Sequence, residues 1–453
     1  MLRPASKLLQ FPNQTPMPTS LIRRLSALAT IFAFTFSARS QVIELRATIN
    51  ATQEVPATAS VARGTAIMLY DLGANAFDLI VSINGYTNTL TDAHVQEAVA
   101  GANGSAVIHF PLASFTNTGG TLTAAMRSVA YPGDKLKLLQ GGAYLNYHSP
   151  QFPSGEVRGQ LIAQPKRLVA NMTVAQEAAA FPALNFAGLN DFGGAVMFYD
   201  AFNNRVSLRL SLYNFNNVLN NSHFHEGAPG VSGGVVVTLG NNPNATFANG
   251  GSYSNGNGHI SGTFDIPYPG DVIKLLTGGS YLNFHTVGTF SGGELRGQVR
   301  ASDEVAGTRF SNLSVRGTVG TGDQVLIQGI TVNGPDPIRA LITAKGPSLT
   351  AFGVTGVLAN PRLTVYDSAG RAIASNDDVG ATTGTDLANV PGVPTNSLES
   401  ALLLVLPPGN YSAIVSSSTG TTGTTGTALL EVNDLRTLNG FVPAEDSTSA
   451  AVQ

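Results

Sequence analysis

The sequence has no cysteine and no tryptophan among its 453 residues. Without thiols the chain forms no disulfide bonds, offers no thiolate metal ligands and has no cysteine nucleophile. Charged residues are also scarce, at 12% of the chain, and the formal net charge is −3 with no basic block. Nucleic acids and anionic membranes are bound by clustered lysine and arginine, so we expect neither as a partner.

Motifs that carry covalent or nucleotide chemistry are missing as well. There is no Gly-x-Ser-x-Gly nucleophile elbow and no glycine-rich phosphate loop that leads into a helix. Glu156 and Glu294 belong to separate repeats of the chain, so they are unsuited to act as a paired acid and base. We therefore predict that the protein is not an enzyme.

Residues 1–40 are typical of a secretory signal peptide. Two arginines precede a short apolar run at residues 25–36, and small residues follow up to Ser40. Met17 gives a leader of more usual length than Met1. No later apolar stretch is long enough to span a bilayer, so we expect a mature chain outside the cytoplasm with no transmembrane segment. An exported, cysteine-free chain rich in Gly, Thr and Asn fits a secreted or envelope protein of a bacterium.

A long polar motif occurs twice in the chain. Tyr144-Leu-Asn-Tyr-His148 followed by Gly155-Glu-Val-Arg-Gly-Gln160 returns as Tyr281-Leu-Asn-Phe-His285 followed by Gly293-Glu-Leu-Arg-Gly-Gln298. The spacing within each motif is kept, whereas the spacing between motifs differs from one copy to the other. Insertions are tolerated in loops and rejected in paired strands. The duplication therefore indicates two copies of one folding unit, with the motifs on its scaffold.

Composition and patterning indicate β structure throughout the chain. Fifty glycines separate short apolar runs, and stretches such as residues 77–83 alternate between apolar and polar side chains. We therefore predict an all-β protein, with two homologous antiparallel β-sandwich or barrel domains at residues 42–163 and 168–301. A third, C-terminal β-sandwich domain is predicted at residues 305–435, before a disordered tail at 436–453.

The last hairpin of each repeat carries polar side chains on one face. Side chains two residues apart on a strand share a face, so Tyr281, Asn283 and His285 lie together. In the return strand the glutamate and arginine are expected to bond to loop backbone and to the neighbouring Asn and His, as a hydrogen-bonded network. The residues assigned to this polar face are His94, Asn146, His148, Glu156, Arg158, Asn283 and Arg296.

The second repeat also contains a candidate metal site. His223 and His225 lie two residues apart, so both imidazoles leave the same face of a strand. His285 would add a third nitrogen and Glu294 an oxygen, a ligand set that suits zinc or copper. In the first repeat Gln96 replaces His225, so coordination by three histidines would need another source there. A hydrogen-bonded network without metal is the alternative interpretation.

The order of these motifs resembles the CHRD domain, the module named after chordin. In the first repeat the resemblance rests on Gln53-Glu-Val-Pro56, on His94 and on the hairpin motif quoted above. The second repeat follows the same order but has Gln176-Glu-Ala-Ala in place of Gln-Glu-Val-Pro. The resemblance implies an extracellular β domain. It implies no activity, because the bacterial members of the family have no settled one.

The third domain resembles the bacterial pre-peptidase C-terminal domains, which are β-sandwiches that serve secreted proteins as attachment or carbohydrate-binding modules. The resemblance rests on strand spacing and on the turns at residues 367–371 and 375–378. Asp367, Asp377 and Asp378 are candidate ligands for calcium, which prefers oxygen atoms from turns. The same residue types are also expected in turns for local hydrogen bonding alone.

These features together predict a non-catalytic binding or adhesion protein of the cell envelope or the extracellular space. Tandem modules would make its binding bivalent, and the expected partner is an extracellular protein or a cell-surface polysaccharide. The competing hypothesis is a metal-binding protein or metalloenzyme centred on the histidines of the second repeat, with zinc or copper as the metal.

Overall fold

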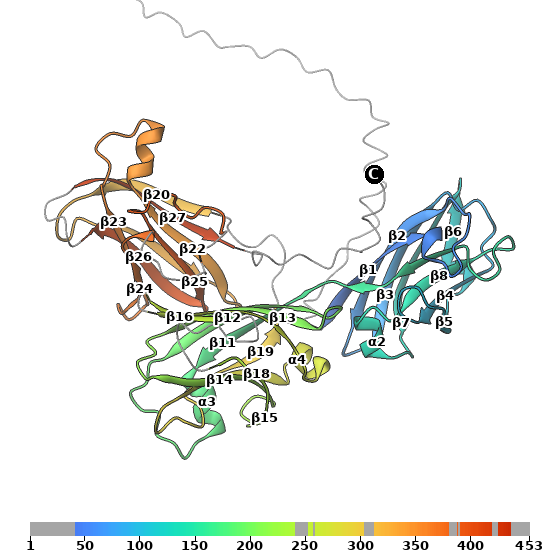
Figure 1. Ribbon diagram of the computed structural model, residues 1–453, viewed down its shortest axis with the longest axis horizontal. Helices are drawn as coiled ribbons and strands as arrows, with labels where there is room; N and C mark the ends of the chain where they lie inside the picture. Colours follow the sequence, from blue (N-terminus) through green and yellow to red (C-terminus); the bar gives the residue numbers. More distant parts are fainter. Residues whose placement is uncertain are drawn as a thin grey trace, which may run out of the picture. The chain divides into compact units, whose positions relative to one another are not determined.

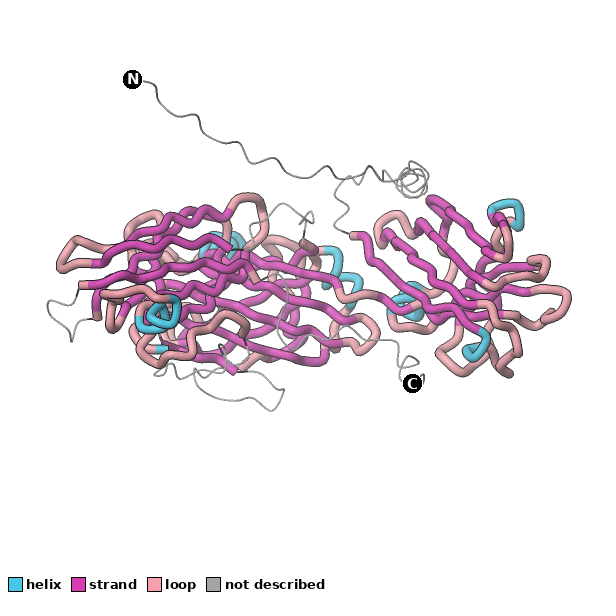
Figure 2. The backbone as a smooth tube through the Cα atoms, turned by 90° about the horizontal axis from the view of Figure 1, so that it is seen from above, coloured by secondary structure: helices cyan, strands magenta, loops and turns pink. Residues whose placement is uncertain are grey.

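Strands make up most of the computed structural model (Figures 1 and 2). The predicted leader at 1–40 and the predicted tail at 436–453 lie outside the described residues. Among the described helices, none has the length and apolar character that a membrane crossing requires. The structure describes residues 41–240, 252–256, 259–302, 312–379, 387, 390–418 and 425–435.

Domain 1 is one curled antiparallel sheet of ten strands. The strand order is β5-β4-β8-β9-β1-β2-β3-β7-β6, with β10 paired to β1. The strands are β1 (Val42–Asn50), β2 (Arg63–Asp71), β3 (Ala76–Asn84), β4 (Asp92–Glu97), β5 (Ser105–His109), β6 (Phe115–Thr118), β7 (Thr121–Ala130), β8 (Tyr144–His148), β9 (Val157–Gln160) and β10 (Ile162–Ala163).

Domain 2 repeats the order of the nine strands that follow one another across the sheet of domain 1, and only β10 has no separate counterpart. Its order is β15-β14-β18-β19-β11-β12-β13-β17-β16, so β14 and β18 take the places of β4 and β8. This agreement confirms the prediction of two homologous antiparallel β domains. The strands are β11 (Lys166–Thr173), β12 (Phe192–Asp200), β13 (Arg205–Tyr213), β14 (Leu219–Glu226), β15 (Gly234–Thr238), β16 (Ser252–Gly256), β17 (His259–Pro267), β18 (Ser280–Thr286) and β19 (Leu295–Ala301).

The C-terminal region is a sandwich of two four-stranded antiparallel sheets, as predicted. The sheet orders are β20-β27-β22-β25 and β21-β26-β23-β24. The buried side chains of this region form a second cluster, which is mostly aliphatic and also includes Tyr411 and, from domain 2, Tyr213. The strands are β20 (Asn312–Val319), β21 (Leu326–Val332), β22 (Ile338–Lys345), β23 (Pro361–Tyr366), β24 (Ala372–Asn376), β25 (Ser400–Leu406), β26 (Gly409–Ser417) and β27 (Gly426–Asp434).

Short helices complete the two curled domains. The carboxylate of Asp271 caps α4 (Val272–Thr277) by accepting from the backbone nitrogens of Ile273 and Lys274, and Gly278 ends the helix in the left-handed conformation. Asp134 caps α2 in domain 1 in the same way. The remaining helices are α2 (Lys135–Leu139), α3 (Val174–Ala180) and the 3-10 helices η1 (Ala51–Gln53), η2 (Leu112–Ser114) and η3 (Pro347–Phe352).

The burial pattern explains why the last hairpin of each domain carries so many polar residues. Along β3 every second residue is buried, as its alternating apolar pattern predicts. Every residue of β8 and of β18 is buried, on both faces of the strand. One face of these strands contacts the apolar core, and loops cover the other. The polar face therefore lies inside each domain, where its donors and acceptors must find partners.

A buried arginine holds one of these covering loops in place. In domain 2 the guanidinium carbon of Arg296 lies 3.5 Å from the centre of the Tyr281 ring. Its nitrogens donate to the carbonyl oxygens of Ala228 at 2.9 Å and Val231 at 3.1 Å. Each buried polar group left unpaired there would cost about 1–3 kcal/mol. Loop 227–233 is therefore tied to the hairpin by the arginine.

The glutamine two residues further on adds a second tie. The side-chain nitrogen of Gln298 donates to three carbonyl oxygens at 2.8–2.9 Å, and its backbone nitrogen donates to Oε1 of Gln176. Domain 1 repeats both ties, with Arg158 over Tyr144 and Gln160 bonded to Gln53. We call each arginine–glutamine pair, Arg158 with Gln160 and Arg296 with Gln298, the hairpin clamp.

The glycine that opens the motif Gly-Glu-x-Arg-Gly-Gln is required by close approach. Gly293 has φ = +137°, a backbone conformation that residues with a Cβ rarely adopt. A Cβ there would lie 2.2 Å from Oε1 of Glu177 and 2.8 Å from Nδ2 of Asn283. Gly155 has the same role in domain 1, with φ = +130° and Glu54 as its neighbour.

We predict that Gly293→Ala destabilises domain 2 by about 3 kcal/mol or more, because backbone strain and a clash with a buried carboxylate add together. Gly292→Ala is the matched control, since no atom lies within 4 Å of a Cβ at that neighbouring position. Calorimetric melting of the two variants checks the prediction. Equal melting profiles for the two variants would contradict the role given to Gly293.

Candidate metal centre

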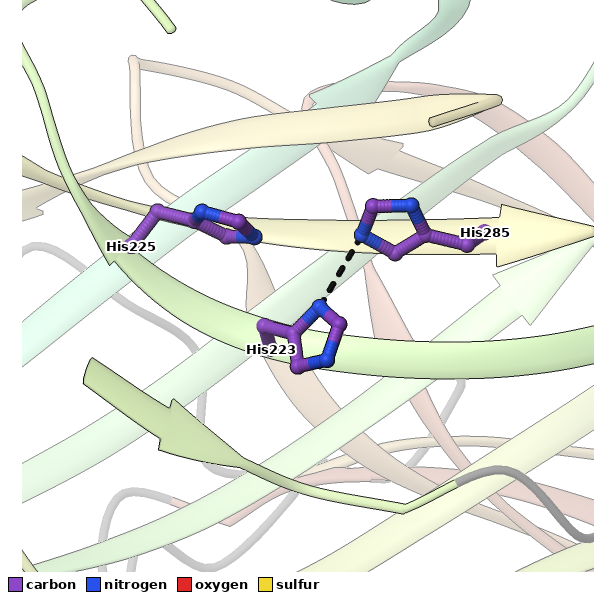
Figure 3. Close-up of side chains that lie close together, drawn as sticks. All are labelled: His223, His225 and His285. Carbon is purple, nitrogen blue, oxygen red and sulfur yellow. Dashed lines mark hydrogen bonds between the residues drawn. The ribbon is translucent and has the colours of Figure 1, made fainter. Parts of the chain in front are cut away.

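Two adjacent strands bring three histidines together in domain 2. His223 and His225 lie on β14, and His285 lies on the neighbouring β18, which runs antiparallel to it. In the register His285 is opposite Asn221, two positions before His223, so the three side chains follow one another on one face. Figure 3 shows the three rings gathered on that face. The structure thus brings together the three histidines that the sequence predicted.

The ring nitrogens of these histidines lie within reach of one ion. Nδ1 of His223 lies 3.0 Å from Nε2 of His285, and one nitrogen from each of the three rings falls within 4.8 Å of the other two. A tetrahedral ion bound by imidazoles at about 2.0–2.1 Å holds its ligand nitrogens about 3.3–3.4 Å apart. The three rings are therefore close enough to converge on one zinc or copper ion after small movements of their side chains.

Two of the three rings are fixed by backbone carbonyls. Nδ1 of His285 donates to the carbonyl oxygen of Ser291 at 3.0 Å, and Nδ1 of His225 donates to that of Gly233 at 2.9 Å. Because a carbonyl only accepts, each Nδ1 carries the proton and each Nε2 carries a lone pair. Within the described part of the chain no group bonds to the buried Nε2 of His225. A hydrogen bond from the other ring nitrogen to a carbonyl oxygen is the contact that orients histidine ligands of metals.

The surroundings keep the three imidazoles neutral. Burial, and then the charges that His285 and His225 would carry, lower the pKa of His223 to about 4. Burial also lowers the pKa values of His225 and His285. A metal competes with protons for the same lone pairs, so imidazoles that are neutral at neutral pH are ready to bind.

The hairpin clamp reaches this cluster through Tyr281. The ring of His225 stacks on that of Tyr281, with centroids 4.9 Å apart and an angle of 7° between the planes. The tyrosine hydroxyl accepts from the backbone nitrogen of Gly233, whose carbonyl fixes His225. Arg296, which lies over the same tyrosine, holds the loop that contains Gly233. The orientation of His225 therefore depends on the clamp.

Glu294 is not part of the cluster, which corrects the predicted ligand set. Its carboxylate accepts from the hydroxyl of Thr286 and, at 2.9 Å, from Nδ2 of Asn217. Thr286 follows His285 on β18 and its side chain therefore points to the opposite face. Glu294 precedes the first residue of β19, so strand alternation did not apply to it. The carboxyl group of Asp191 is its other neighbour.

The remaining residues of the predicted polar face form a buried network. Asn146 donates to Oε1 of Gln96 at 3.2 Å, and Asn283 donates to Glu177 at 3.3 Å. Glu156 was expected to bond to loop backbone and to the neighbouring Asn and His, but its carboxylate accepts from the side chains of Ser60 and Asn88 instead. The carboxylates near the clamp arginines are those of Glu54 and Glu177, from the Gln-Glu segments at the start of each domain.

In domain 1 the predicted His94 and His148 also lie together, with ring centroids 4.7 Å apart. Two residues that the sequence analysis missed join them, Asp92 and His109. Asp92 precedes His94 by two residues, so the shared face was visible from spacing alone. His109 lies opposite His94 on β5, and only the strand register shows this.

The calcium candidates are not brought together. Asp367 follows β23 and Asp377 follows β24, so they lie at opposite ends of that hairpin. Asp367 accepts from two backbone nitrogens of its turn and pairs with Arg371 at 2.8 Å. Asp377 accepts from Ser418 at 2.7 Å. Asp378 joins neither of the two candidate ligand groups found among the described residues, so the arrangement is that of local turn bonding.

Comparison with known families agrees with this geometry. The family model of the CHRD domain matches residues 45–161 and 168–299, which together make up more than half of the chain. Each match ends one residue after the clamp glutamine of its domain, Gln160 or Gln298. No curated protein matches the chain.

The paired carboxyl groups generate a prediction on pH. Burial, and then the neighbouring Glu294, raise the pKa of Asp191 from 3.8 to about 7. Between these two pKa values the folded protein keeps a proton that the unfolded chain has lost. The contribution of Asp191 to the free energy of unfolding is therefore fully present below about pH 4 and is lost as the pH rises to about 7. We predict that Asp191→Asn removes this fall in the melting temperature of domain 2.

The exposed Asp323→Asn is the control and should leave the pH profile unchanged. Melting curves of the two variants and of the parent chain between pH 4 and pH 8 test the pairing. An Asp191→Asn profile that runs parallel to that of the parent would show that Asp191 does not hold a proton in the folded state.

Proposed function

The chain belongs to the CHRD domain family, and from this premise we propose that it is an exported, non-catalytic binding protein whose second CHRD domain holds a zinc or copper ion. The observation that carries the proposal is the convergence of His223, His225 and His285, with two of the rings fixed through Nδ1. CHRD domains typically occur outside the cell, which agrees with the predicted leader. A bacterial envelope or secreted protein is the setting that we propose.

The chemistry of the site favours binding over turnover. Three neutral nitrogens satisfy three positions of a tetrahedral zinc ion and would leave the fourth for water or a ligand. A hydrolytic zinc site also needs a group that moves a proton. Glu294, which was predicted as an oxygen ligand of the metal, bonds instead to Thr286 and Asn217. Among the described residues the cluster contains only the three histidines.

A second binding function is supported by a cleft in the C-terminal sandwich. The cleft has a volume of about 740 Å³ and is lined by charged side chains of both signs, including Arg316, Lys345 and Glu431. Phe352, at the end of η3, also lines it and is 82% exposed. An exposed aromatic ring beside polar groups suits a sugar, which offers an apolar face and hydroxyl groups. We infer that this domain attaches the protein to cell-surface polysaccharide.

For the metal, we predict that the mature chain, freed of metal by chelation, takes up zinc or copper in calorimetric titration. His223→Ala should lose one bound ion, or bind it about 100-fold more weakly or worse. His223 is only half-buried, so its replacement should leave the fold intact. Asn220→Ala, an exposed position on the same strand, is the control. Unchanged ion uptake by His223→Ala would end the proposal.

For the polysaccharide, we predict that the mature chain is retained on at least one of insoluble cellulose, chitin and peptidoglycan. Phe352→Ala should weaken retention about tenfold, which corresponds to about 1.4 kcal/mol of lost contact. Val61→Ala removes a side chain of similar exposure from domain 1 and should change nothing. Absence of retention on all three polymers, or equal retention of both variants, would contradict this role.

A further inference from the structure

Domain 1 keeps two of the three histidine positions of domain 2. His94 on β4 takes the place of His223, and His148 on β8 takes the place of His285. The ring centroids of the two pairs are 4.7 Å and 4.8 Å apart, respectively. Nδ1 of His148 donates to the carbonyl oxygen of Pro153 at 3.1 Å, as His285 does to Ser291. The same pair of imidazoles is therefore built in both domains.

In domain 1 the third imidazole nitrogen comes from a different strand than in domain 2. Gln96 replaces His225 and is used by Asn146. On the opposite neighbour strand, β5, His109 lies directly across from His94, and the two rings are 4.2 Å apart. In domain 2 the residue across from His223 is Thr238. In domain 2 the third imidazole lies on β14, the strand of His223, whereas in domain 1 it lies on β5, the strand next to that of His94.

A carboxylate completes the group in domain 1. Oδ2 of Asp92 lies 2.7 Å from Nε2 of His94 and 3.3 Å from Nδ1 of His109. One ligand atom from each of these three residues falls within 4.8 Å of the other two. The residue in the place of Asp92 in domain 2 is Asn221, which pairs with His285 as Asp92 pairs with His148. Domain 1 therefore exchanges one imidazole for a charged oxygen.

Unused lone pairs point to a ligand at this place. His148 is only 8% exposed, its Nδ1 proton is held by Pro153, and no described residue bonds to its Nε2. Nδ1 of the buried His94 also lacks a partner within the described chain. Buried ring nitrogens without partners are costly unless something is bound to them.

We propose that domain 1 contains a second metal site, formed by Asp92, His94 and His109 with His148 beside them, and that this site binds zinc. Two imidazoles and a carboxylate are an ordinary ligand set for zinc. The site is more open than the one in domain 2, because the side chain of His109 is 66% exposed. It rests on its own residues, so it stands or falls separately from the site in domain 2.

The test is zinc titration of the mature, metal-free chain by calorimetry, with the bound zinc counted by elemental analysis. The parent chain should bind two ions. His109→Ala should lose one of them, or bind it about 100-fold more weakly, and His223→Ala should lose the other. Ser105→Ala, an exposed position on β5, is the control for His109 and should bind two ions.

Each outcome separates the two sites. If His109→Ala binds zinc as the parent chain does, the site in domain 1 is wrong, whatever His223→Ala does. If His109→Ala loses one ion, the site in domain 1 is supported even when His223→Ala changes nothing. Asp92→Asn provides a second variant that keeps the size of the side chain, and the proposal requires it to weaken zinc binding as well. A hydrogen-bonded network without metal predicts no zinc uptake by either variant or parent.

Discussion

The structure of both CHRD domains depends on a buried arginine whose terminal guanidinium nitrogens donate to acceptors inside the domain. Arg158 and Arg296 are each only 1% exposed, and burying a guanidinium is costly unless such acceptors are present. The acceptors are carbonyl oxygens of a loop, and the ring below is a tyrosine. The hydrogen bonds from the arginine to these carbonyls therefore fix the loop over the hairpin. The glutamine two residues later, Gln160 or Gln298, binds further carbonyl oxygens in the same way. Because the loop covers the polar face of the hairpin, the side chains on that face are buried.

The histidine clusters are a consequence of that interior. In domain 2 the loop that Arg296 holds supplies the carbonyl that orients His225, so the clamp and the histidine cluster are physically connected. The two domains share the clamp and the His94–His148 or His223–His285 pair, but they differ in the third ligand. A scaffold that keeps the pair and varies the neighbouring strand can produce sites of different charge. The duplication thus separates the residues that both domains share, the clamp and the histidine pair, from those that differ between the two histidine clusters.

Much of this was predictable, because it depends on spacing along the chain. The repeated motifs predicted two β domains of one topology, and alternation along a strand placed His223 and His225 on one face. His285, from the later hairpin, was suggested as the third ligand. Glu294 was misplaced, because it precedes its strand and turns toward Thr286. His109 was missed, since its proximity to His94 comes from the pairing of β4 with β5, which no local pattern shows. The carboxylates beside the arginines come from Gln-Glu segments about 100 residues earlier, which only the folded sheet brings near.

The most direct test of this account is a crystal structure of the mature chain soaked with zinc, with anomalous diffraction data recorded at the zinc edge. The account predicts one anomalous peak bound by Nδ1 of His223 and by Nε2 of His225 and His285, at about 2.0–2.1 Å from each. The carbonyls of Gly233 and Ser291 should still accept from the two Nδ1 atoms. A map with no peak among these three imidazoles, or with their rings turned away from one another, would contradict it.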